Sequence, residues 1–393
     1  MRRQNLALVL REVAAAGPLS RADVAAASGL TRAAVSSLVE ELIGSGLLAE
    51  LGPAPSGRVG RPGTALTLNP QGPAGLGAEV GVEHLAACAV DLRGEVRAWR
   101  RVAADNRTRP AAETLADLAA LLRTVAAEVA PELHPAGLGL AVPGLVGVQA
   151  GLVQRAANLG WSGLPVIAVL RSQLRAVGAP ELAALPAEVD NEANLGGLAE
   201  LWLGGHDGAE DFVHISAEAG IGAALIVAGR LFRGARGFAG ELGHVPVEPE
   251  GPPCPCGARG CLEQYAGERA VRRAAGTAAV GGDWVGLLTE RAAAGDRAVL
   301  AALERAGTAL GTAVAGAVNL IDPAAVILGG GYAELGEWLL PGMHRELAAR
   351  VTVRPWSPEW LAVSSLGRRG PLLGAATGVV RAIVEDPGRF AAR

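Results

Sequence analysis

Lysine is absent from this sequence of 393 residues, and all 35 of its basic residues are arginine. Any reaction that needs a lysine amine is therefore excluded. Aromatic residues make up only 3% of the chain, so the hydrophobic cores must be built from Ala, Val, Leu and Gly. Half of the residues are hydrophobic and 19% are charged, which excludes an intrinsically disordered chain.

Long apolar runs are also missing. No uninterrupted apolar run reaches the roughly 18 residues that a membrane span needs, so we expect no membrane partner. The apolar stretch near the N-terminus is broken by Arg11 and Glu12, which is typical of an amphipathic helix rather than of a signal peptide. These features predict a cytoplasmic protein.

The net charge of −4 excludes a basic protein that coats nucleic acid. Charge is unevenly distributed, however, because residues 1–68 hold seven arginines against five acidic residues while the remainder is acidic. A slightly basic front on an acidic body favours nucleic-acid contact through the N-terminal part.

The first 46 residues have the pattern of three short helices. An apolar stripe over residues 4–15 predicts the first helix, which Gly17-Pro18 ends. Ser20 is expected to cap a second helix over residues 21–28, with Asp23 in its first turn. A third helix is expected to begin at Thr31, and the pair of helices joined by a tight turn is typical of a helix-turn-helix.

Two expected strands follow, and the Gly- and Arg-rich segment between them predicts a wing. The third helix would enter a DNA major groove, and the wing would reach phosphates or the minor groove. A three-helix packing module with a surface hairpin is the alternative. The predicted DNA-binding residues are Thr31, Arg32, Ser36, Ser37, Arg58 and Arg61.

From residue 75 onward, expected strands alternate with expected helices, which predicts an α/β fold. Helices are expected over about 111–130 and 165–177, and strand-turn-strand openings at 77 and 213 suggest two related lobes. We expect three parts: a DNA-binding module over 1–70, a first lobe over 75–188 with the helix 371–390, and a second lobe over 189–370.

Three of the four cysteines lie within eight residues of one another. Cys254, Cys256 and Cys261 follow His244, and three thiolates with one imidazole suit tetrahedral zinc. Because four protein ligands close the coordination shell, we predict a structural zinc rather than a catalytic one. The alternative is a set of reduced thiols in a loop, and Cys88 is expected to be an ordinary buried residue.

Residues 237–247, GFAGELGHVPV, and 254–267, CPCGARGCLEQYAG, resemble the signature of the ROK family of repressors, open reading frames and kinases. The stretches AGIGAALIVAGRLFRGARG and VDNEANLGGLAE resemble two further segments of that family, and the likeness covers about residues 75–385. The resemblance, which is to the branch of xylose and N-acetylglucosamine repressors, implies an actin-like, ribonuclease-H-like pair of lobes with a sugar in the cleft. The family's repressors place a winged helix-turn-helix in front of that body.

The resemblance also implies the sugar contacts, which are Asn191, Glu192, Glu241, His244 and Glu263. His244 would hold zinc through one ring nitrogen and face the sugar with the other. Glu241 and Glu263 are alternatively supports of the zinc loop, and Asn194 alternatively caps the helix that follows. Trp161 either stacks on a sugar or belongs to the core.

A kinase of this family carries a phosphate loop resembling Asp-x-Gly-Gly-Thr-Lys, and the matching residues 79–84 here are Glu-Val-Gly-Val-Glu-His. Val82 adds a side chain where phosphate approaches the backbone, and Glu83 repels anions. Glu192 stands at the position of the catalytic base with one extra methylene. We therefore predict no enzyme activity.

The sequence favours a transcriptional regulator, expected to be a repressor, that binds operator DNA and responds to a monosaccharide. The resemblance to the ROK family implies xylose, glucose and N-acetylglucosamine as candidate effectors. An ATP-dependent sugar kinase with an accessory DNA-binding domain is the alternative, and a zinc-stabilised scaffold without ligand has no positive support. Because one recognition helix reads too few bases, we expect a homo-oligomer, a dimer or tetramer, on an inverted repeat.

Overall fold

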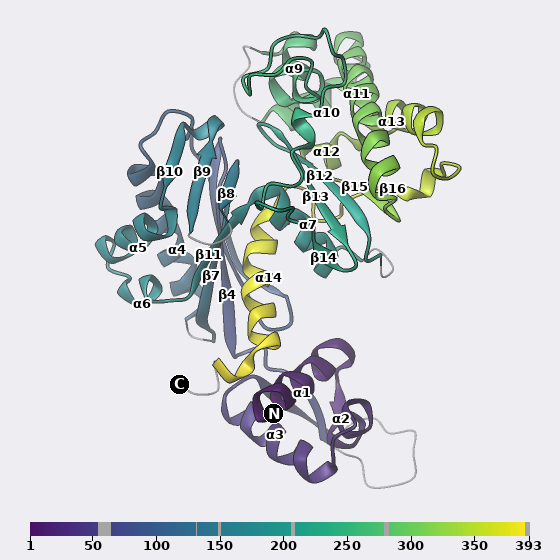
Figure 1. Cartoon of the computed structure of the whole chain (residues 1–393). Helices are drawn as coiled ribbons and strands as arrows, with labels where there is room; N and C mark the ends of the chain where they lie inside the picture. The colour runs from purple at the N-terminus through teal and green to yellow at the C-terminus, as the bar shows by residue number, and fades with distance from the viewer. Residues whose placement is uncertain (54–63, 131, 148–150, 206–208, 279–282, 390–393) are drawn as a thin grey trace. The chain divides into compact units, whose positions relative to one another are not determined.

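A computed structural model describes residues 1–53, 64–130, 132–147, 151–205, 209–278 and 283–389. The chain separates into two compact units (Figure 1). The first comprises residues 1–141, 165–189 and 375–393, and the second comprises residues 142–164 and 190–374. The division into three parts that the sequence suggests remains a prediction.

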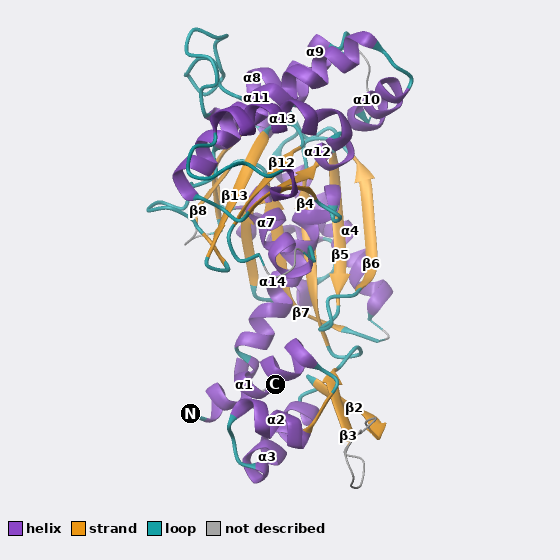
Figure 2. Cartoon of the chain, turned by 90° about the vertical axis from the view of Figure 1, so that its right-hand side faces the viewer, coloured by secondary structure: helices purple, strands orange, loops and turns teal. Residues whose placement is uncertain are grey.

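The front of the first unit is a small module of three helices and a three-stranded sheet. The strand order is β1-β3-β2, and β3 pairs antiparallel with both neighbours. Val9, Leu10, Val35 and Leu42 are fully buried between the helices. Figure 2 shows the β2–β3 hairpin beside α1, α2 and α3. The elements are α1 (Arg2–Ala16), β1 (Leu19–Ser20), α2 (Arg21–Ser28), α3 (Arg32–Gly44), β2 (Leu48–Pro53) and β3 (Thr64–Leu68).

Local signals fix the ends of these helices. The Ser20 hydroxyl accepts a hydrogen bond from the Asp23 backbone N–H at 3.2 Å, and the Asp23 carboxylate accepts one from the Ser20 backbone N–H. This reciprocal pair is a capping box. Gly29 ends α2 with φ of +69°, in the left-handed region that favours glycine. The Thr31 hydroxyl then caps α3 by accepting from the Ala34 N–H.

The first unit continues as a five-stranded sheet of order β11-β7-β4-β5-β6. β4 pairs antiparallel with β5 and parallel with β7. β4 and β5 are buried along their whole length, whereas β6 is an exposed edge strand. The elements are β4 (Pro73–Val80), β5 (His84–Val90), β6 (Val96–Ala103), α4 (Ala111–Val129), β7 (His134–Val142), α5 (Val166–Ala176), α6 (Pro180–Ala183) and β11 (Ala187–Asn191).

The C-terminal helix α14 (Gly370–Glu385) packs closely on this sheet. A Cβ on Gly75 would lie 2.2 Å from the Ala376 carbonyl oxygen, and one on Gly139 would lie 2.1 Å from that of Ala375. Only glycine permits this close approach. Just after α14, Asp386 pairs with Arg3 of α1, and the short 3-10 turn Pro387–Arg389 contacts the same helix.

The second unit contains a five-stranded sheet of order β14-β13-β12-β15-β16. As in the first sheet, an antiparallel hairpin is extended by a third strand on one side and by two further strands on the other, although β14 has only two residues where β6 has eight. The elements are α7 (Glu192–Leu203), β12 (Phe212–Ala217), β13 (Ile221–Val227), β14 (Arg230–Leu231), α8 (Glu263–Ala266), α9 (Glu268–Ala274), α10 (Trp284–Ala293), α11 (Arg297–Ile321), β15 (Ala325–Gly330), α12 (Gly331–Glu334), α13 (Gly336–Arg350) and β16 (Leu361–Val363). A separate sheet is formed by β8 (Leu145–Gly147), β9 (Leu152–Ala156) and β10 (Trp161–Leu164).

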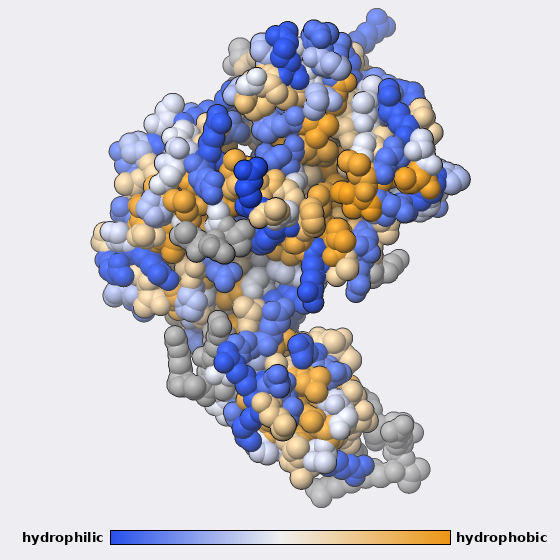
Figure 3. All heavy atoms as spheres, in the orientation of Figure 1, coloured by the Kyte–Doolittle hydropathy of each residue, from blue (hydrophilic) through white to orange (hydrophobic). Residues whose placement is uncertain are grey.

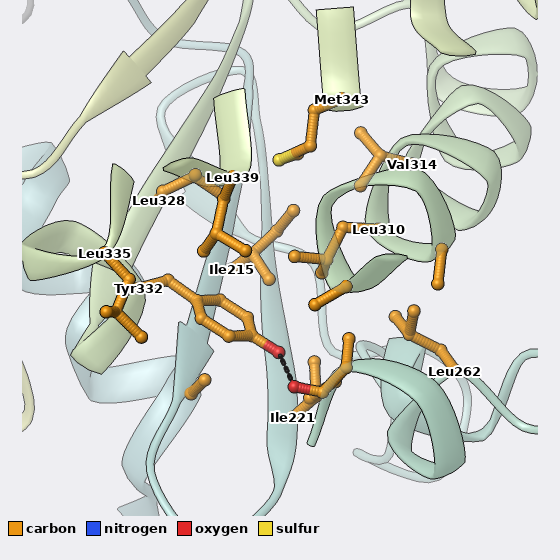
Figure 4. Close-up of a cluster of buried hydrophobic side chains, with 14 of the residues drawn as sticks. Ile215, Ile221, Leu262, Leu310, Val314, Leu328, Tyr332, Leu335, Leu339 and Met343 are labelled. Carbon is orange, nitrogen blue, oxygen red and sulfur yellow. Dashed lines mark hydrogen bonds between the residues drawn. The ribbon is translucent and has the colours of Figure 1, made fainter. Parts of the chain in front are cut away.

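Aliphatic side chains form most of the core of the second unit, together with Trp284, Tyr332 and Met343, and Figure 4 shows a part of this core. Tyr332 is 1% exposed, and its hydroxyl donates to the Ala266 carbonyl at 2.9 Å. The hydrogen bond satisfies the polar group inside the core. Burial raises the pKa of Tyr332 far above its ordinary value, and the negative charge of Glu263 adds to the shift. This contact joins α12 to the helix α8.

Helix α11 is long and apolar enough to cross a membrane, and it is the one helix of that kind among the described residues. However, 61% of its apolar window is buried inside the structure, and it packs along α13. Its composition is therefore explained by its place in the core.

Hydrophilic and hydrophobic side chains are interspersed over the face drawn in Figure 3.

Candidate metal cluster, ligand site and DNA-reading helix

Four side chains of the second unit converge as a candidate metal site. One ligand atom from each of His244, Cys254, Cys256 and Cys261 lies within 4.8 Å of the other three. Cys256 Sγ is 3.7 Å from Cys261 Sγ, and His244 Nδ1 is 3.8 Å from Cys254 Sγ. A tetrahedral ion with bonds of about 2.3 Å needs ligand separations of about 3.8 Å. The donor set and its spacing therefore fit a metal ion.

The backbone forms this cluster with two tight turns. A short 3-10 turn, Leu242–His244, presents His244, and the Gly257 N–H donates to the Cys254 carbonyl at 2.9 Å. Gly260 has φ of +64°, and a Cβ there would lie 1.6 Å from the Glu248 carbonyl oxygen. The glycine is therefore required by both its conformation and the space around it. Burial and the neighbouring sulfurs raise the pKa of the Cys261 thiol to about 12 when no cation is present.

The second ring nitrogen of His244 lies near Glu241. Its Nε2 lies 3.9 Å from Glu241 Oε2. Burial raises the pKa of Glu241, the charge of His244 lowers it, and the negative charge of Glu263 raises it again. His244 and Glu263 therefore both act on the charge of Glu241, and His244 is also a member of the candidate metal cluster.

Glu263 is held by the glycine turn between β12 and β13. Its Oε2 accepts the Ile221 backbone N–H at 3.3 Å. A Cβ on Gly220 would lie 2.8 Å from that oxygen and 3.6 Å from Asn158 Nδ2. Asn158, which the sequence analysis did not select, thus lies at the same turn as Glu263. There was little reason in the sequence to select Asn158 as a site residue, because it is distant in sequence from every other predicted contact.

Asn191 and Glu192 form the start of α7. The Asn191 side-chain oxygen accepts the backbone N–H groups of Ala193 and Asn194, at 2.8 and 3.2 Å, and its amide nitrogen donates to the Gly144 carbonyl. Asn191 is therefore the helix cap, and the suggestion that Asn194 caps this helix is wrong. One amide hydrogen of Asn191 is not used by these bonds.

Trp161 belongs to the core. The side chain is 5% exposed, which favours the core alternative over stacking on a sugar. Among the described residues, its indole N–H has no acceptor.

The predicted DNA-reading residues are on the surface of the front module. Thr31, Arg32, Ser36 and Ser37 are all exposed on α3 or at its cap, while Val35 and Leu38 of the same helix are buried. Besides being a predicted DNA contact, Thr31 stabilises the start of α3, because its hydroxyl caps the helix. Arg58 and Arg61 lie outside the described residues.

Residues 79–84 form a closed turn between β4 and β5. Glu79 and His84 are 2% and 6% exposed, and His84 Nε2 lies 3.2 Å from Glu79 Oε1. The imidazole rests against Gly81, where a Cβ would lie 2.2 Å from a ring atom. The Asn106 amide donates to the Gly81 carbonyl at 2.8 Å. The side chains of Glu79, His84 and Asn106 thus hold this turn closed.

The sequence profile of the ROK family matches residues 75–381. The chain belongs to the ROK family. A xylose repressor of Bacillus subtilis is 29% identical over 97% of this chain and 96% of its own length. A ROK family transcriptional regulator, a homologue of the E. coli MLC protein, has a TM-score of 0.80 and 24% identity, over 100% of this chain and 99% of that one. A ROK family glucokinase from Streptomyces griseus, in complex with glucose and AMPPNP, has a TM-score of 0.63 and 28% identity over 77% of this chain and 98% of that one.

The expected fold is confirmed by these similarities. This ROK protein has a winged helix-turn-helix module followed by the two-lobed, actin-like body that ROK regulators and ROK sugar kinases have in common. The kinase structure covers only part of this chain, whereas the regulator structure covers all of it.

Proposed function

We infer that this ROK protein is a sugar-responsive transcriptional repressor. The observation that carries this conclusion is the extent of similarity: a xylose repressor matches 97% of the chain, and a regulator structure matches all of it. The front module supplies an exposed helix with hydrogen-bonding side chains, which suits base edges in a major groove. We propose that it acts in the cytoplasm, on operator DNA.

We propose that a monosaccharide binds to the second unit through Asn191, Glu192, Glu241, His244 and Glu263. Carboxylates accept hydrogen bonds from sugar hydroxyls, and an imidazole can donate or accept. The proximity of Glu241, His244 and Glu263 supports this set, and Asn158 beside Glu263 is a further candidate contact. Because carboxylates dominate the set, we expect an uncharged sugar and not a sugar phosphate.

We propose that the metal is zinc, held by His244, Cys254, Cys256 and Cys261. Four protein ligands leave no open position, so the ion supplies a structural cross-link and no catalysis. Coordination through Nδ1 would fix the His244 ring and leave Nε2 directed toward Glu241. The proposed metal and sugar sites therefore share one residue.

We propose that the protein has no sugar kinase activity. The contact between Glu79 and His84 supports this proposal, because the imidazole occupies the place that a Cβ on Gly81 would take. Gly222 of β13 is explained by packing, since a Cβ there would lie 2.7 Å from the Ala193 Cβ. Similarity to a glucokinase and the carboxylate of Glu192 favour the alternative, an ATP-dependent sugar kinase.

One set of measurements separates repressor from kinase. The full chain is used to select duplexes from a random-sequence DNA library. The complex of the protein with the selected duplex is then titrated with D-xylose, D-glucose and N-acetyl-D-glucosamine. We expect a sequence-specific complex whose affinity changes with one of the sugars. In a coupled assay with ATP and the same sugars we expect no turnover above background. Turnover of about 1 per second or more would overturn the repressor conclusion.

We also propose that the DNA-bound form is a homo-oligomer, a dimer or a tetramer. Two recognition helices, spaced about one turn of DNA apart, are needed for specificity. Sedimentation of the full chain with the selected duplex tests this proposal. A complex of one chain per duplex at micromolar concentration would contradict it.

A further inference from the structure

Asp190 organises the first turn of α7. It lies in β11, one residue before the cap Asn191, and its side chain is 13% exposed. One carboxylate oxygen accepts the Asn191 backbone N–H at 2.7 Å and the Asn194 side-chain amide at 3.0 Å. Asp190 therefore fixes the turn that carries the proposed sugar contacts Asn191 and Glu192.

The other oxygen of Asp190 accepts a hydrogen bond from Arg233 Nη2 at 2.5 Å. Arg233 begins the segment 233–240, which follows β14 and leads directly to Glu241. This segment is closed by the Ala239 N–H, which donates to the Arg233 carbonyl at 3.1 Å. At its far end, the Ala223 N–H of β13 donates to the Gly240 carbonyl at 2.9 Å. Arg233 is thus part of the segment that presents Glu241.

We propose that Arg233 is a positioning residue for the sugar site. Through Asp190 it ties the Asn191–Glu192 turn to the segment that presents Glu241, and so fixes the two halves of the site relative to each other. The inference rests on the proposed sugar-binding function, and Arg233 itself need not contact the sugar. A ring of sugar hydroxyls requires its partners at hydrogen-bond distances from fixed directions, so a tie between the two halves should matter for affinity.

The pair differs from an ordinary surface ion pair of the same unit. Arg345 and Glu304 also approach to 2.7 Å, but their side chains are 53% and 50% exposed. Exposed pairs of that kind contribute little because water screens them. Arg233 is 35% exposed and Asp190 only 13%, so their charge-assisted hydrogen bond is better shielded. The pair Arg345–Glu304 therefore provides a matched control.

The test compares the full-length wild type with Arg233→Met, Arg233→Lys and the control Arg345→Met. Calorimetric titration with D-xylose, D-glucose and N-acetyl-D-glucosamine identifies the sugar that the wild type binds. For that sugar we expect Arg233→Met to weaken binding about tenfold, and Arg233→Lys, which keeps the charge, to recover most of the loss. Arg345→Met should bind like the wild type.

A second measurement separates positioning from general stability. The sugar-induced rise of the melting temperature should shrink in Arg233→Met, while its melting temperature without sugar and its metal content stay close to those of the wild type. Asp190→Asn completes a double-mutant cycle, and the double variant should bind no more weakly than the weaker single variant.

Each outcome decides the inference. If the wild type binds a sugar and Arg233→Met binds it equally well, the inference is wrong and the proposed function stands. The inference is also wrong if Arg233→Met lowers the melting temperature without sugar but leaves the sugar-induced rise unchanged, because the role is then structural. If the wild type binds no sugar of the panel, the proposed function fails and the inference fails with it.

Discussion

Replacing Gly240 by alanine should displace the backbone that carries the proposed sugar contact Glu241. Its φ is +103°, and a Cβ there would lie 2.0 Å from the Ala223 carbonyl oxygen. An alanine in a left-handed conformation costs about 1–2 kcal/mol, and forcing an extra methyl into a packed site costs about 1–3 kcal/mol. Because Ala223 pairs with Ile215 in the β12–β13 ladder, the oxygen has little freedom to move. The structure therefore predicts that segment 233–240 and Glu241 shift in Gly240→Ala.

Gly295→Ala is the matched control for this variant. Gly295 also has a positive φ, of +78°, but no atom lies within 4 Å of the added Cβ. The control carries the conformational cost alone, and the difference between the two variants isolates the steric overlap, about 2 kcal/mol. For a unit of this size, that difference corresponds to a melting temperature about 4–8 °C lower.

Thermal unfolding followed by differential scanning fluorimetry, with and without the sugar that the wild type binds, provides both readouts. Gly240→Ala should melt below Gly295→Ala and should lose most of its sugar-induced stabilisation, whereas Gly295→Ala should keep it. If the two variants melt together and respond equally to sugar, the placement of Glu241 by Gly240 is refuted.

Three further variants test the other sites. Cys256→Ala should retain less than about half an equivalent of metal and should melt at a lower temperature, because metal binding and folding are coupled; a full equivalent of zinc by metal analysis would count against the proposed ligand set. Ser20→Ala removes the capping box of α2 and should destabilise the front module by about 1 kcal/mol in thermal unfolding, whereas Ser20→Thr should stay near the wild type. Arg32→Ala should weaken binding to the selected duplex by about 1–3 kcal/mol and affect random DNA much less, as measured by fluorescence anisotropy. An equal loss on both DNAs would mean that Arg32 contacts only phosphate.

The helix boundaries of the front module were predictable because their signals are local. Ser20 and Asp23 interact within one turn, and Gly29 needs only its own backbone conformation to end α2. The Cys and His side chains of the proposed metal cluster were predictable for a similar reason. Their donor chemistry is specific, and all four residues lie between positions 244 and 261.

Contacts between distant segments could not be predicted in this way. Asp190 and Arg233 are 43 positions apart, and nothing in the spacing of either residue predicts their pairing. The cap of α7 shows a different difficulty, since Asn191 and Asn194 are the same residue type within one turn. In the structure, the Asn191 side-chain oxygen accepts the free backbone N–H groups at the start of α7, whereas the Asn194 side-chain amide donates a hydrogen bond to Asp190. Sequence alone offers no way to rank the two.

The contact between Arg3 and Asp386 has a consequence for the synthesis of the chain. A ribosome produces the chain from its N-terminus, so all residues of the front module emerge before α14 exists. Arg3 of α1 can pair with Asp386 only after Asp386 itself has been made. A product that terminates early would contain every residue of the described helices α1, α2 and α3 but would lack this contact. The contact between α1 and the residue that follows α14 therefore forms only in a protein that has been translated at least as far as Asp386.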